Sequence, residues 1–245
     1  MTRFRTLLLG AALGAQLLGS QPLTHAAVPA VIVASYDVSY NGLQFGVIRE
    51  QFETANNAYR IVSESHAVGL LALFRRNSAT LVSSGRLLGT GLRPEYFEGR
   101  NNNDESRSVS ARFDWAGKRL TFSHEGRTET APLPPGTQDR ISLLYQFMFV
   151  AFEELGHLDV AMTNGRKLDE YRYLITRNVE IDTPLGRMKT LHLAKQRQPD
   201  ESAAELWLAP QHHFFPVKVL IVEKDGTRYE QVITKLELGP QQLKP

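Results

Sequence analysis

The sequence predicts a mainly β protein, in which a curved antiparallel sheet forms a barrel or half-barrel around one buried apolar helix. About a dozen segments alternate apolar and polar residues, as half-buried strands do. Asn-Gly and Asp-Gly pairs, which favour tight hairpins, separate some of them. One run, at about residues 138–154, is instead apolar on nearly every side and predicts the helix. A flat sheet of this size would expose two edges, so we expect it to curve or to divide into a sandwich.

The first 26 residues have the pattern of an export signal. Arg3 and Arg5 supply the positive start, residues 7–18 form a short apolar core, and small residues end the segment at Ala26. A helix that spans a bilayer needs roughly 20 continuous apolar residues, and this core is shorter. We therefore expect cleavage near Ala26, a periplasmic location and no transmembrane span afterwards.

Composition argues against several classes of protein. The chain has 28 Lys and Arg and 26 Asp and Glu, and the signal removes two cations, which leaves 26 residues of each sign. A mature chain near neutrality lacks the basic footprint of a protein that binds nucleic acid. The sequence contains no cysteine, which excludes disulfides, thiolate metal sites and lipid attachment to an N-terminal cysteine. These features predict a soluble product.

The first predicted strands follow the signal. Residues 33–40 alternate, Asn41-Gly42 tolerates positive φ, and residues 43–52 resume the alternation, which predicts a hairpin. The same pattern recurs in residues 108–115 and 119–123, on either side of a short turn. These segments predict an antiparallel meander.

A second series of strands fills the C-terminal part. The alternating segments are residues 168–181, 187–195, 204–209, 214–224 and 227–238. Asp225-Gly226 separates the last two and is the clearest hairpin signal in the sequence. Since no low-complexity linker divides the chain, we expect one β-rich domain over residues 33–239 and a tail at 240–245.

The apolar run begins after a strong stop signal. Pro134-Pro135-Gly136 ends the preceding strand, and Thr137 or Asp139 can cap the first amides of a helix. Between residues 141 and 152 only two side chains are polar, whereas an exposed helix buries one stripe of about 100°. The helix is therefore expected to be enclosed.

Two roles are open for this helix. It either plugs the core, or it forms a lid or wall of an apolar ligand cavity. In the second case its large side chains contact the ligand, and the candidates are Tyr145, Met148, Phe149 and Phe152. Arg75 and Arg76 are further candidates, because one of two consecutive strand residues faces inward and a buried arginine needs an anion. An acidic side chain or the acidic head of a ligand could supply that anion.

The sequence lacks the common motifs for catalysis and metal binding. It has no G-x-S-x-G nucleophile turn, no H-E-x-x-H motif and no glycine-rich phosphate loop before a helix. His212 and His213 would point to opposite faces of a strand, so a polar loop is the expected setting, and the other histidines are scattered. We expect no enzymatic activity, no cofactor and no bound metal.

Seven runs occur in a characteristic order: GLLALFRRNSATLVSSGRL, LRPEYF, RFDWAGKRLTF, GTQDRISLLYQF, IDTPLGRMKTLHL, AELWLAP and FFPVKVLIVEKDG. They resemble the conserved blocks of the exported bacterial family called domain of unknown function 3108, over about residues 36–238. The resemblance implies an exported β-rich domain with one central helix, and it supplies no catalytic residues. More remotely, the layout is similar to the half-barrels of periplasmic lipoprotein carriers, which is a likeness of fold.

Two classes of function are open. The first is a non-enzymatic periplasmic protein that binds or carries an apolar or amphipathic molecule, such as a lipid or the acyl chain of a lipoprotein, between sheet and helix. The second is a cell-envelope assembly or scaffolding protein with a filled core, to which an envelope protein binds at the surface or by strand addition. Both line the interior with the same residues, so the sequence does not separate them.

Overall fold

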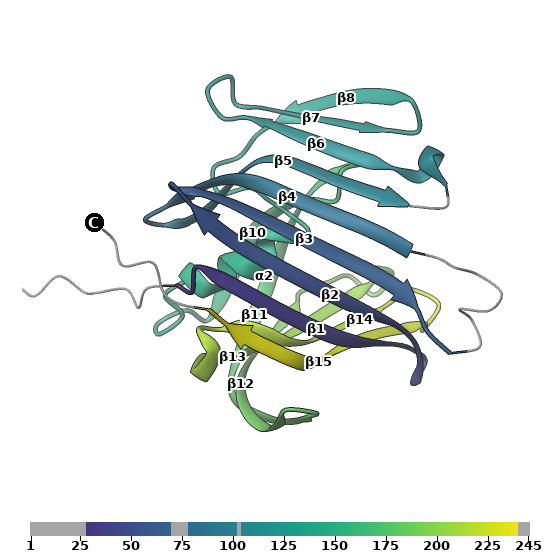
Figure 1. The fold of residues 1–245 in the computed structure, drawn as a ribbon, viewed down its shortest axis with the longest axis vertical. Coiled ribbons are helices and arrows are strands. Elements are labelled where there is room, and N and C mark those ends of the chain that lie inside the picture. Colours follow the sequence, from purple (N-terminus) through teal and green to yellow (C-terminus); the bar gives the residue numbers. More distant parts are fainter. Residues whose placement is uncertain (1–27, 70–77, 102–103, 240–245) are drawn as a thin grey trace, which may run out of the picture.

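The structure, a computed structural model, describes residues 28–69, 78–101 and 104–239 (Figure 1). The predicted export signal, its cleavage point at Ala26, the tail at 240–245 and the candidates Arg75 and Arg76 lie outside these ranges. Within the ranges, no helix has the length and apolar character needed to cross a bilayer.

Fifteen strands make up most of the described chain. The first eight are β1 (Val31–Tyr40), β2 (Leu43–Ala55), β3 (Ala58–Ala67), β4 (Ser78–Leu88), β5 (Gly91–Asn101), β6 (Val109–Asp114), β7 (Arg119–His124) and β8 (Arg127–Pro132). The others are β9 (Gln138–Asp139), β10 (His157–Thr163), β11 (Leu168–Thr183), β12 (Gly186–Lys195), β13 (Ala203–Ala209), β14 (Phe215–Val222) and β15 (Arg228–Leu238). The short helices are η1 (Glu105–Arg107), α2 (Ser142–Gln146), η2 (Phe147–Phe149) and η3 (Pro210–His212).

All fifteen strands belong to one sheet. Their order is β8-β7-β6-β5-β4-β3-β2-β1-β15-β14-β13-β12-β11-β10-β9. Among the described strands, β9 and β10 pair in parallel and every other pair is antiparallel. Since this order has two free ends, the sheet is open, and the predicted curved half-barrel is confirmed.

The Asn41-Gly42 pair forms the turn between β1 and β2, as its sequence predicts. Asn41 has φ 47° and Gly42 has φ 82°, values that asparagine and glycine tolerate best. The Asn41 side chain accepts a hydrogen bond from the backbone N–H of Arg228 at 2.9 Å, and the Asn41 N–H donates to the Arg228 carbonyl at 2.9 Å. The turn is therefore fixed to the start of β15.

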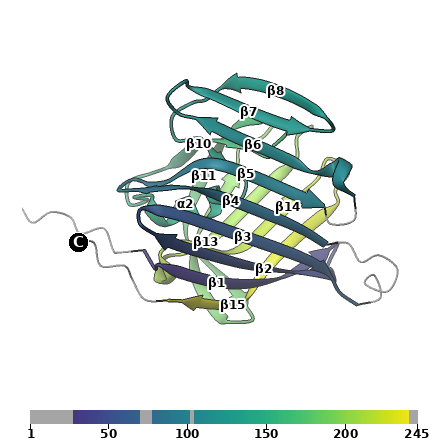
Figure 2. The same cartoon turned by 45° about the horizontal axis from the view of Figure 1, so that its top comes forward.

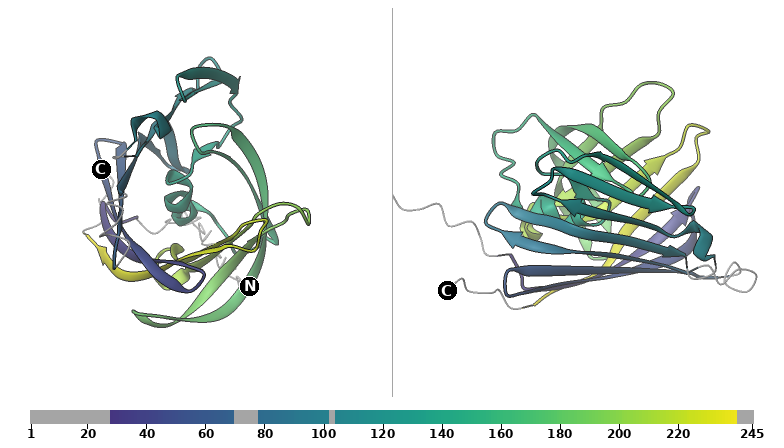
Figure 3. Two further views of the ribbon diagram at one scale, coloured as in Figure 1. Left: turned by 90° about the vertical axis from the view of Figure 1, so that its right-hand side faces the viewer. Right: turned by 90° about the horizontal axis from the view of Figure 1, so that it is seen from above.

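The sheet bends so strongly that its two halves enclose α2 (Figure 2 and Figure 3). Viewed end-on in the left panel of Figure 3, α2 lies inside the ring of strands. Bulges support the bending, and one lies between Ser84 and Gly85 of β4. A Cβ on Gly85 would lie 2.2 Å from the carbonyl oxygen of Arg93, so only glycine permits this approach of two backbones.

The helix is shorter than the sequence predicts. The prediction extends over about residues 138–154, but Gln138–Asp139 form β9 and helical backbone continues only through α2 and η2. Val150 already has extended backbone, with φ −88° and ψ 130°. The error has a physical cause, because irregular backbone also places apolar side chains in the core. Phe152 is buried in this segment, whereas Ala151 and Glu153 on either side of it are exposed.

Side chains of α2 and η2 fill the space between the two halves of the sheet. The Tyr145 ring stacks on Phe52 of β2 with 5.0 Å between centroids, and it meets Phe215 of β14 edge-on at 5.4 Å. Leu143 and Phe147 join a second buried cluster with leucines of β12 and β13, namely Leu191, Leu193, Leu206 and Leu208. The prediction that the helix is enclosed is confirmed.

Candidate functional site

A buried polar network closes the end of the interior that holds the helix. The Tyr145 hydroxyl donates to Oε2 of Glu50 at 3.1 Å, and Ser63 Oγ donates to Oε1 at 3.1 Å. All three residues are buried. Burial raises the pKa of the Glu50 carboxyl, and the two hydrogen bonds oppose this rise. The network anchors the helix to β2 and β3.

Asp139 forms a second buried centre, where the chain enters the helix. Its Oδ1 accepts hydrogen bonds from the backbone N–H groups of Ile141 at 3.0 Å and Ser142 at 2.9 Å. Its Oδ2 accepts a hydrogen bond from Ser83 of β4. Burial raises the pKa of the Asp139 carboxyl, against the effect of these bonds. Of the two predicted capping residues, Asp139 is therefore the one that binds the first amides.

The ligand-binding candidates on the helix lie at packing positions. Tyr145, Met148 and Phe152 are buried, and Phe149 is half-buried. Tyr145 and Met148 belong to the main core cluster, whereas Phe152 lies in the second cluster, 5.0 Å from the ring centroid of Phe214. The structure thus divides the four candidates between two cores, and a contact between them and a ligand stays a prediction.

Away from the helix, the inner face of the sheet becomes accessible to water. On β3, Tyr59, Ile61 and Ser63 are buried, but Ser65 and Ala67, which share their face, are half-buried. Four other strands show the same change from a buried to a half-buried inward residue. The pairs are Ser83 and Leu81 on β4, Tyr173 and Tyr171 on β11, Leu193 and Lys195 on β12, and Leu206 and Ala204 on β13. The inner face is therefore buried at the helix and partly exposed towards the other end of the strands, which is called the open end below.

Antiparallel connectivity determines which turns surround this open end. Successive turns of a meander alternate between the two ends of a sheet. The turns after β2, β4, β6 and β11 lie at the helix end, while those after β1, β7, β10, β12 and β14 lie at the open end. Segments far apart in the sequence therefore meet around the opening.

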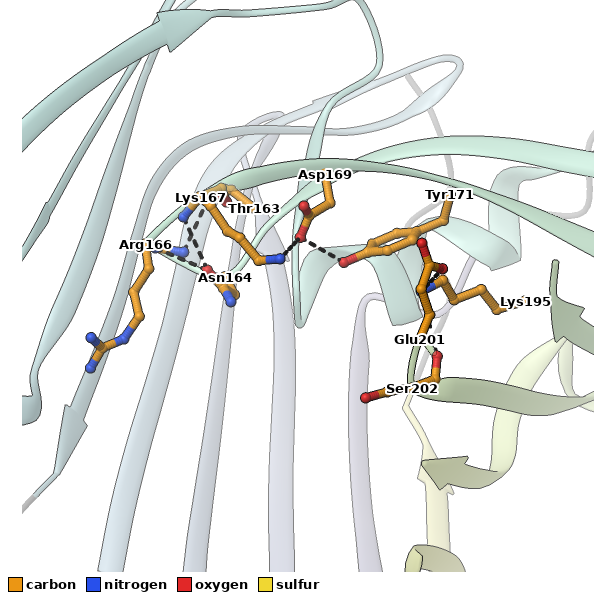
Figure 4. Close-up of polar contacts among 10 residues, drawn as sticks. Thr163, Asn164, Arg166, Lys167, Asp169, Tyr171, Lys195, Glu201 and Ser202 are labelled. Atoms are coloured by element: carbon orange, nitrogen blue, oxygen red, sulfur yellow. Dashed lines mark hydrogen bonds and ion pairs between the residues drawn. The ribbon is translucent and has the colours of Figure 1, made fainter. Parts of the chain in front are cut away.

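At the open end, β11, the end of β12 and the connection that follows it form a polar hollow (Figure 4). It is lined from both faces of β11, by Tyr171 on the inner face and by Arg172 on the opposite one. Lys167 Nζ lies 2.8 Å from Oδ2 of Asp169, and the Tyr171 hydroxyl donates to the same oxygen at 2.8 Å. Lys195 Nζ lies 3.2 Å from Oε2 of Glu201 and 4.8 Å from the centre of the Tyr171 ring. These groups line a hollow of about 610 Å³, called the mouth below.

The chemistry of the mouth suits recognition of a polar group. Burial, and then the hydrogen bond to Asp169, raise the pKa of Tyr171 well above its usual value, so the hydroxyl remains a donor at physiological pH. The ammonium groups of Lys167 and Lys195 alternate with the carboxylates of Asp169 and Glu201. Such an arrangement can contact both charges of a zwitterion or the polar head of a neutral molecule.

The paired histidines lie in a turn, as the polar-loop interpretation predicts. His212 ends η3, and His213 has left-handed backbone with φ 55°. Burial lowers the pKa of His212, and the neighbouring His213 lowers it further. Across the described ranges, no three metal-binding side chains form a group that could hold an ion.

The sequence reasoning did not single out Asp169, Tyr171 or Lys195. The alternation of residues 168–181 does place Asp169, Tyr171 and Tyr173 on one face of β11, and this signal could have found them. It does not identify that face as the inner one, because Arg172 and its neighbours make the opposite face polar as well.

Comparisons with known proteins agree with this fold. The model of the family described as protein of unknown function (DUF3108) matches residues 35–234. A solved structure from Brucella abortus, a β-barrel-like protein of domain of unknown function DUF1849, shares 10% sequence identity with the chain. It has a TM-score of 0.57, with 88% of this chain and 100% of that chain covered, which shows a likeness of fold alone.

Two further solved structures have lower scores. A candidate lipoprotein from Parabacteroides distasonis has 7% identity and a TM-score of 0.36, over 86% of this chain and 96% of its own. A candidate exported protein with a YmcC-like fold from Bacteroides fragilis has 9% identity and a TM-score of 0.37, over 86% and 98%. No curated protein matches the chain.

Proposed function

The chain belongs to the DUF3108 family of proteins of unknown function, and from this premise we propose that it is an exported, non-enzymatic protein that binds an amphipathic ligand in the open end of its curved sheet. The family resemblance drawn from the seven sequence runs is thereby confirmed. In the proposed complex the apolar part of a lipid-like molecule lies against the inner face, and its polar head lies in the mouth. The predicted signal in residues 1–26 directs the protein to the periplasm.

The change in accessibility along the inner face carries this proposal. A plug that filled the whole interior would bury every inner side chain, because protein cores are packed without large voids. Here half-buried apolar side chains remain on the inner face, including Ile48 on β2, Leu81 on β4 and Val219 on β14. Covering such groups contributes about 25 cal/mol for each Å² removed from water. An apolar chain therefore gains free energy by covering the inner face beyond the end of the helix.

The position of the mouth indicates that the ligand is amphipathic. Tyr171 lies on the same face of β11 as the buried Tyr173, and Lys195 lies on the same face of β12 as the buried Leu193. Tyr171 and Lys195 are the ones nearer to the open end. A molecule that lies along this face therefore passes from apolar contacts to hydrogen-bonding groups within a few residues. Binding sites of this kind combine an apolar lining with a few polar groups that fix orientation.

Two tryptophan substitutions on β4 test the proposal. Leu81 faces inward and Val82 faces the outer surface, and both are half-buried apolar residues. Leu81→Trp should fill the opening and weaken binding of the uncharged dye N-phenylnaphthylamine about tenfold or more, equivalent to about 1.4 kcal/mol. Val82→Trp is the matched control and should bind the dye like the wild type. Dye fluorescence titrations measure both, and urea unfolding verifies that each variant is folded.

Two outcomes would contradict the proposal. Equal dye affinity in the two variants would place the dye outside the curved sheet. Absence of dye binding by delipidated wild type, with no lipid detected by mass spectrometry in an organic extract of the purified protein, would indicate a closed interior.

A second candidate function uses the edge of the sheet. β8 is the last strand on one side, and five of its six residues are exposed. An unpaired edge can accept an extended segment of an envelope protein by strand addition. This function would be favoured if the dye experiment failed and a backbone-blocking substitution in β8, such as Thr130→Pro, abolished capture of an envelope protein.

A further inference from the structure

Large apolar side chains gather on the rim of the open end. Leu43 is 75% exposed, Tyr40 43% and Tyr229 37%, and Phe45 is half-buried beside them. The ring centroids of Tyr40 and Tyr229 are 5.4 Å apart, and Phe45 lies 6.4 Å from Tyr40 and 6.5 Å from Tyr229. These four residues are called the rim patch.

The fold holds the rim patch in place before any partner binds. Tyr40 and Leu43 flank the turn between β1 and β2, and Tyr229 is the direct strand partner of Tyr40. The two hydrogen bonds between Asn41 and Arg228 join this turn to β15. An ordered apolar patch loses little conformational entropy on docking.

The other exposed leucines of the described residues are each less exposed than Leu43, with Leu174 at 49% and Leu238 at 38%. Leu88 is 40% exposed and Leu185 is 41% exposed, and both lie at the turns of the helix end. The exposed tyrosines of the described residues, Tyr40 at 43% and Tyr229 at 37%, both lie in the rim patch. Single exposed apolar residues are ordinary on protein surfaces, whereas a cluster indicates an interaction site.

Two cations lie next to the rim patch. Lys224 belongs to the turn before β15 and also lines the mouth, and Arg228 begins β15 beside Tyr229. Both are exposed, and neither pairs with a carboxylate in the described residues. Glu223 and Asp225 of this turn stay charged, because they bind the neutral Ser202 hydroxyl at 2.6 Å and the Thr227 N–H at 2.9 Å, and neither forms an ion pair with the two cations in the described residues. The two cations are therefore available to phosphate groups.

We propose that the rim patch docks the open end on the surface of a phospholipid bilayer, with the mouth turned towards the lipid. Tyrosine rings favour the interface of a bilayer, a protruding leucine inserts among acyl chains, and lysine and arginine bind headgroup phosphates. Lys224 connects the patch to the mouth, so docking would place a bilayer at the ligand's point of entry. This inference rests on the proposed function, because a lipid-like ligand comes from a bilayer.

The test is co-sedimentation of the full mature protein with vesicles of phosphatidylethanolamine and phosphatidylglycerol. Leu43→Ser should lower vesicle affinity about tenfold, because the most exposed apolar group of the patch is lost. Leu185→Ser, at the opposite end, is the matched control and should bind like the wild type. Replacing Lys224 and Arg228 together by glutamine should also weaken binding and reduce its dependence on salt.

Dye binding in the same variants separates this inference from the proposed function. Loss of vesicle binding by Leu43→Ser with normal dye binding supports docking through the rim patch. Wild type that does not sediment with vesicles, or equal sedimentation of the Leu43→Ser and Leu185→Ser variants, overturns the inference even where dye binding is normal. Vesicle binding that depends on Leu43 in a protein that binds no dye would uphold docking and remove the proposed function.

Discussion

Glu50 is a carboxylic acid with 4% exposure, set among the buried residues of the interior. Its hydrogen-bond donors, Ser63 and Tyr145, favour the charged form, but burial has the larger effect and raises its pKa. A carboxyl group with a higher pKa in the folded state binds a proton on folding when the pH lies between the unfolded and folded values. Its contribution to stability is therefore full below the unfolded pKa and falls as the pH rises towards the folded pKa.

Glu50→Gln should remove this pH dependence. Glutamine can still accept a hydrogen bond from Ser63, but it does not ionise. The free energy of unfolding of the variant, relative to wild type, should therefore increase between about pH 4 and the folded pKa, by at most about 1.4 kcal/mol per pH unit. Urea unfolding across this range measures the difference, and Glu53→Gln, at an exposed position of β2, controls for the loss of one charge. A pH-independent difference between Glu50→Gln and wild type would argue against the raised pKa.

At the scale of elements, Arg177 of β11 holds the chain that leaves η2. Its Nη2 lies 2.6 Å from the carbonyl oxygen of Phe152, 3.0 Å from that of Glu153 and 2.8 Å from that of Leu155. Carbonyl groups beyond the end of a helix have no partner within the helix. One guanidinium group therefore fixes the course of an irregular segment.

Arg177→Met should destabilise the protein by about 1 to 3 kcal/mol, because carbonyl groups lose charged donors. Arg172→Met is the matched control on the same strand. Arg172 forms an exposed ion pair with Asp159, with Nε and Oδ1 2.7 Å apart, and pairs of this kind contribute little to stability. Urea midpoints of the two variants provide the comparison. An equal loss in both would mean that the segment after η2 is held by packing alone.

The elements differ in how far the sequence predicts them. The hairpins at Asn41-Gly42 and Asp225-Gly226 could be predicted because the chemistry of a tight turn is local. The cap at Asp139 could be predicted as well, because it binds the nearby amides of Ile141 and Ser142. The end of the helix could not, because Arg177 of β11 binds carbonyl groups beyond η2 in contacts that depend on the folded arrangement. The apolar residues up to Phe152 indicate burial, but they do not indicate whether the backbone is helical or irregular.

For the whole molecule, the sequence predicts the faces of the sheet better than the depth of its interior. Ile61 and Leu81 are both apolar and both face inward, yet the first is buried and the second is half-buried. The difference depends on how far α2 reaches into the curved sheet, which alternation does not encode. The mouth depends on the pairing of β11 with β12, since the pair Tyr173 and Lys195 brings Tyr171 next to the connection that holds Glu201.

The two edges of the sheet, in the region of β5 to β8 and at β10, contact each other. This contact maintains the curved shape at the open end. The turn after β10 rests on β5 and β6, where the atoms nearest to a Cβ on Gly165 would belong to the side chains of Val109 and Phe97. Arg166 of this turn pairs with Glu125 of the turn after β7. Since β7 and β10 are far apart in the strand order, these contacts cross the seam of the open sheet.

Gly165→Ala and Gly126→Ala separate this contact from backbone strain. Both glycines have positive φ, 87° at Gly165 and 72° at Gly126, so alanine at either position incurs left-handed strain of roughly 1–2 kcal/mol. A Cβ on Gly165 would also lie 2.8 Å from Cγ2 of Val109, whereas a Cβ on Gly126 would have no neighbour within 4 Å. Gly165→Ala should therefore cost about 1–3 kcal/mol more, through overpacking at the seam, and have the lower Tm in thermal unfolding. Equal Tm values would show that the two edges of the sheet are not in contact in solution. The mouth would then be wider than in the structure.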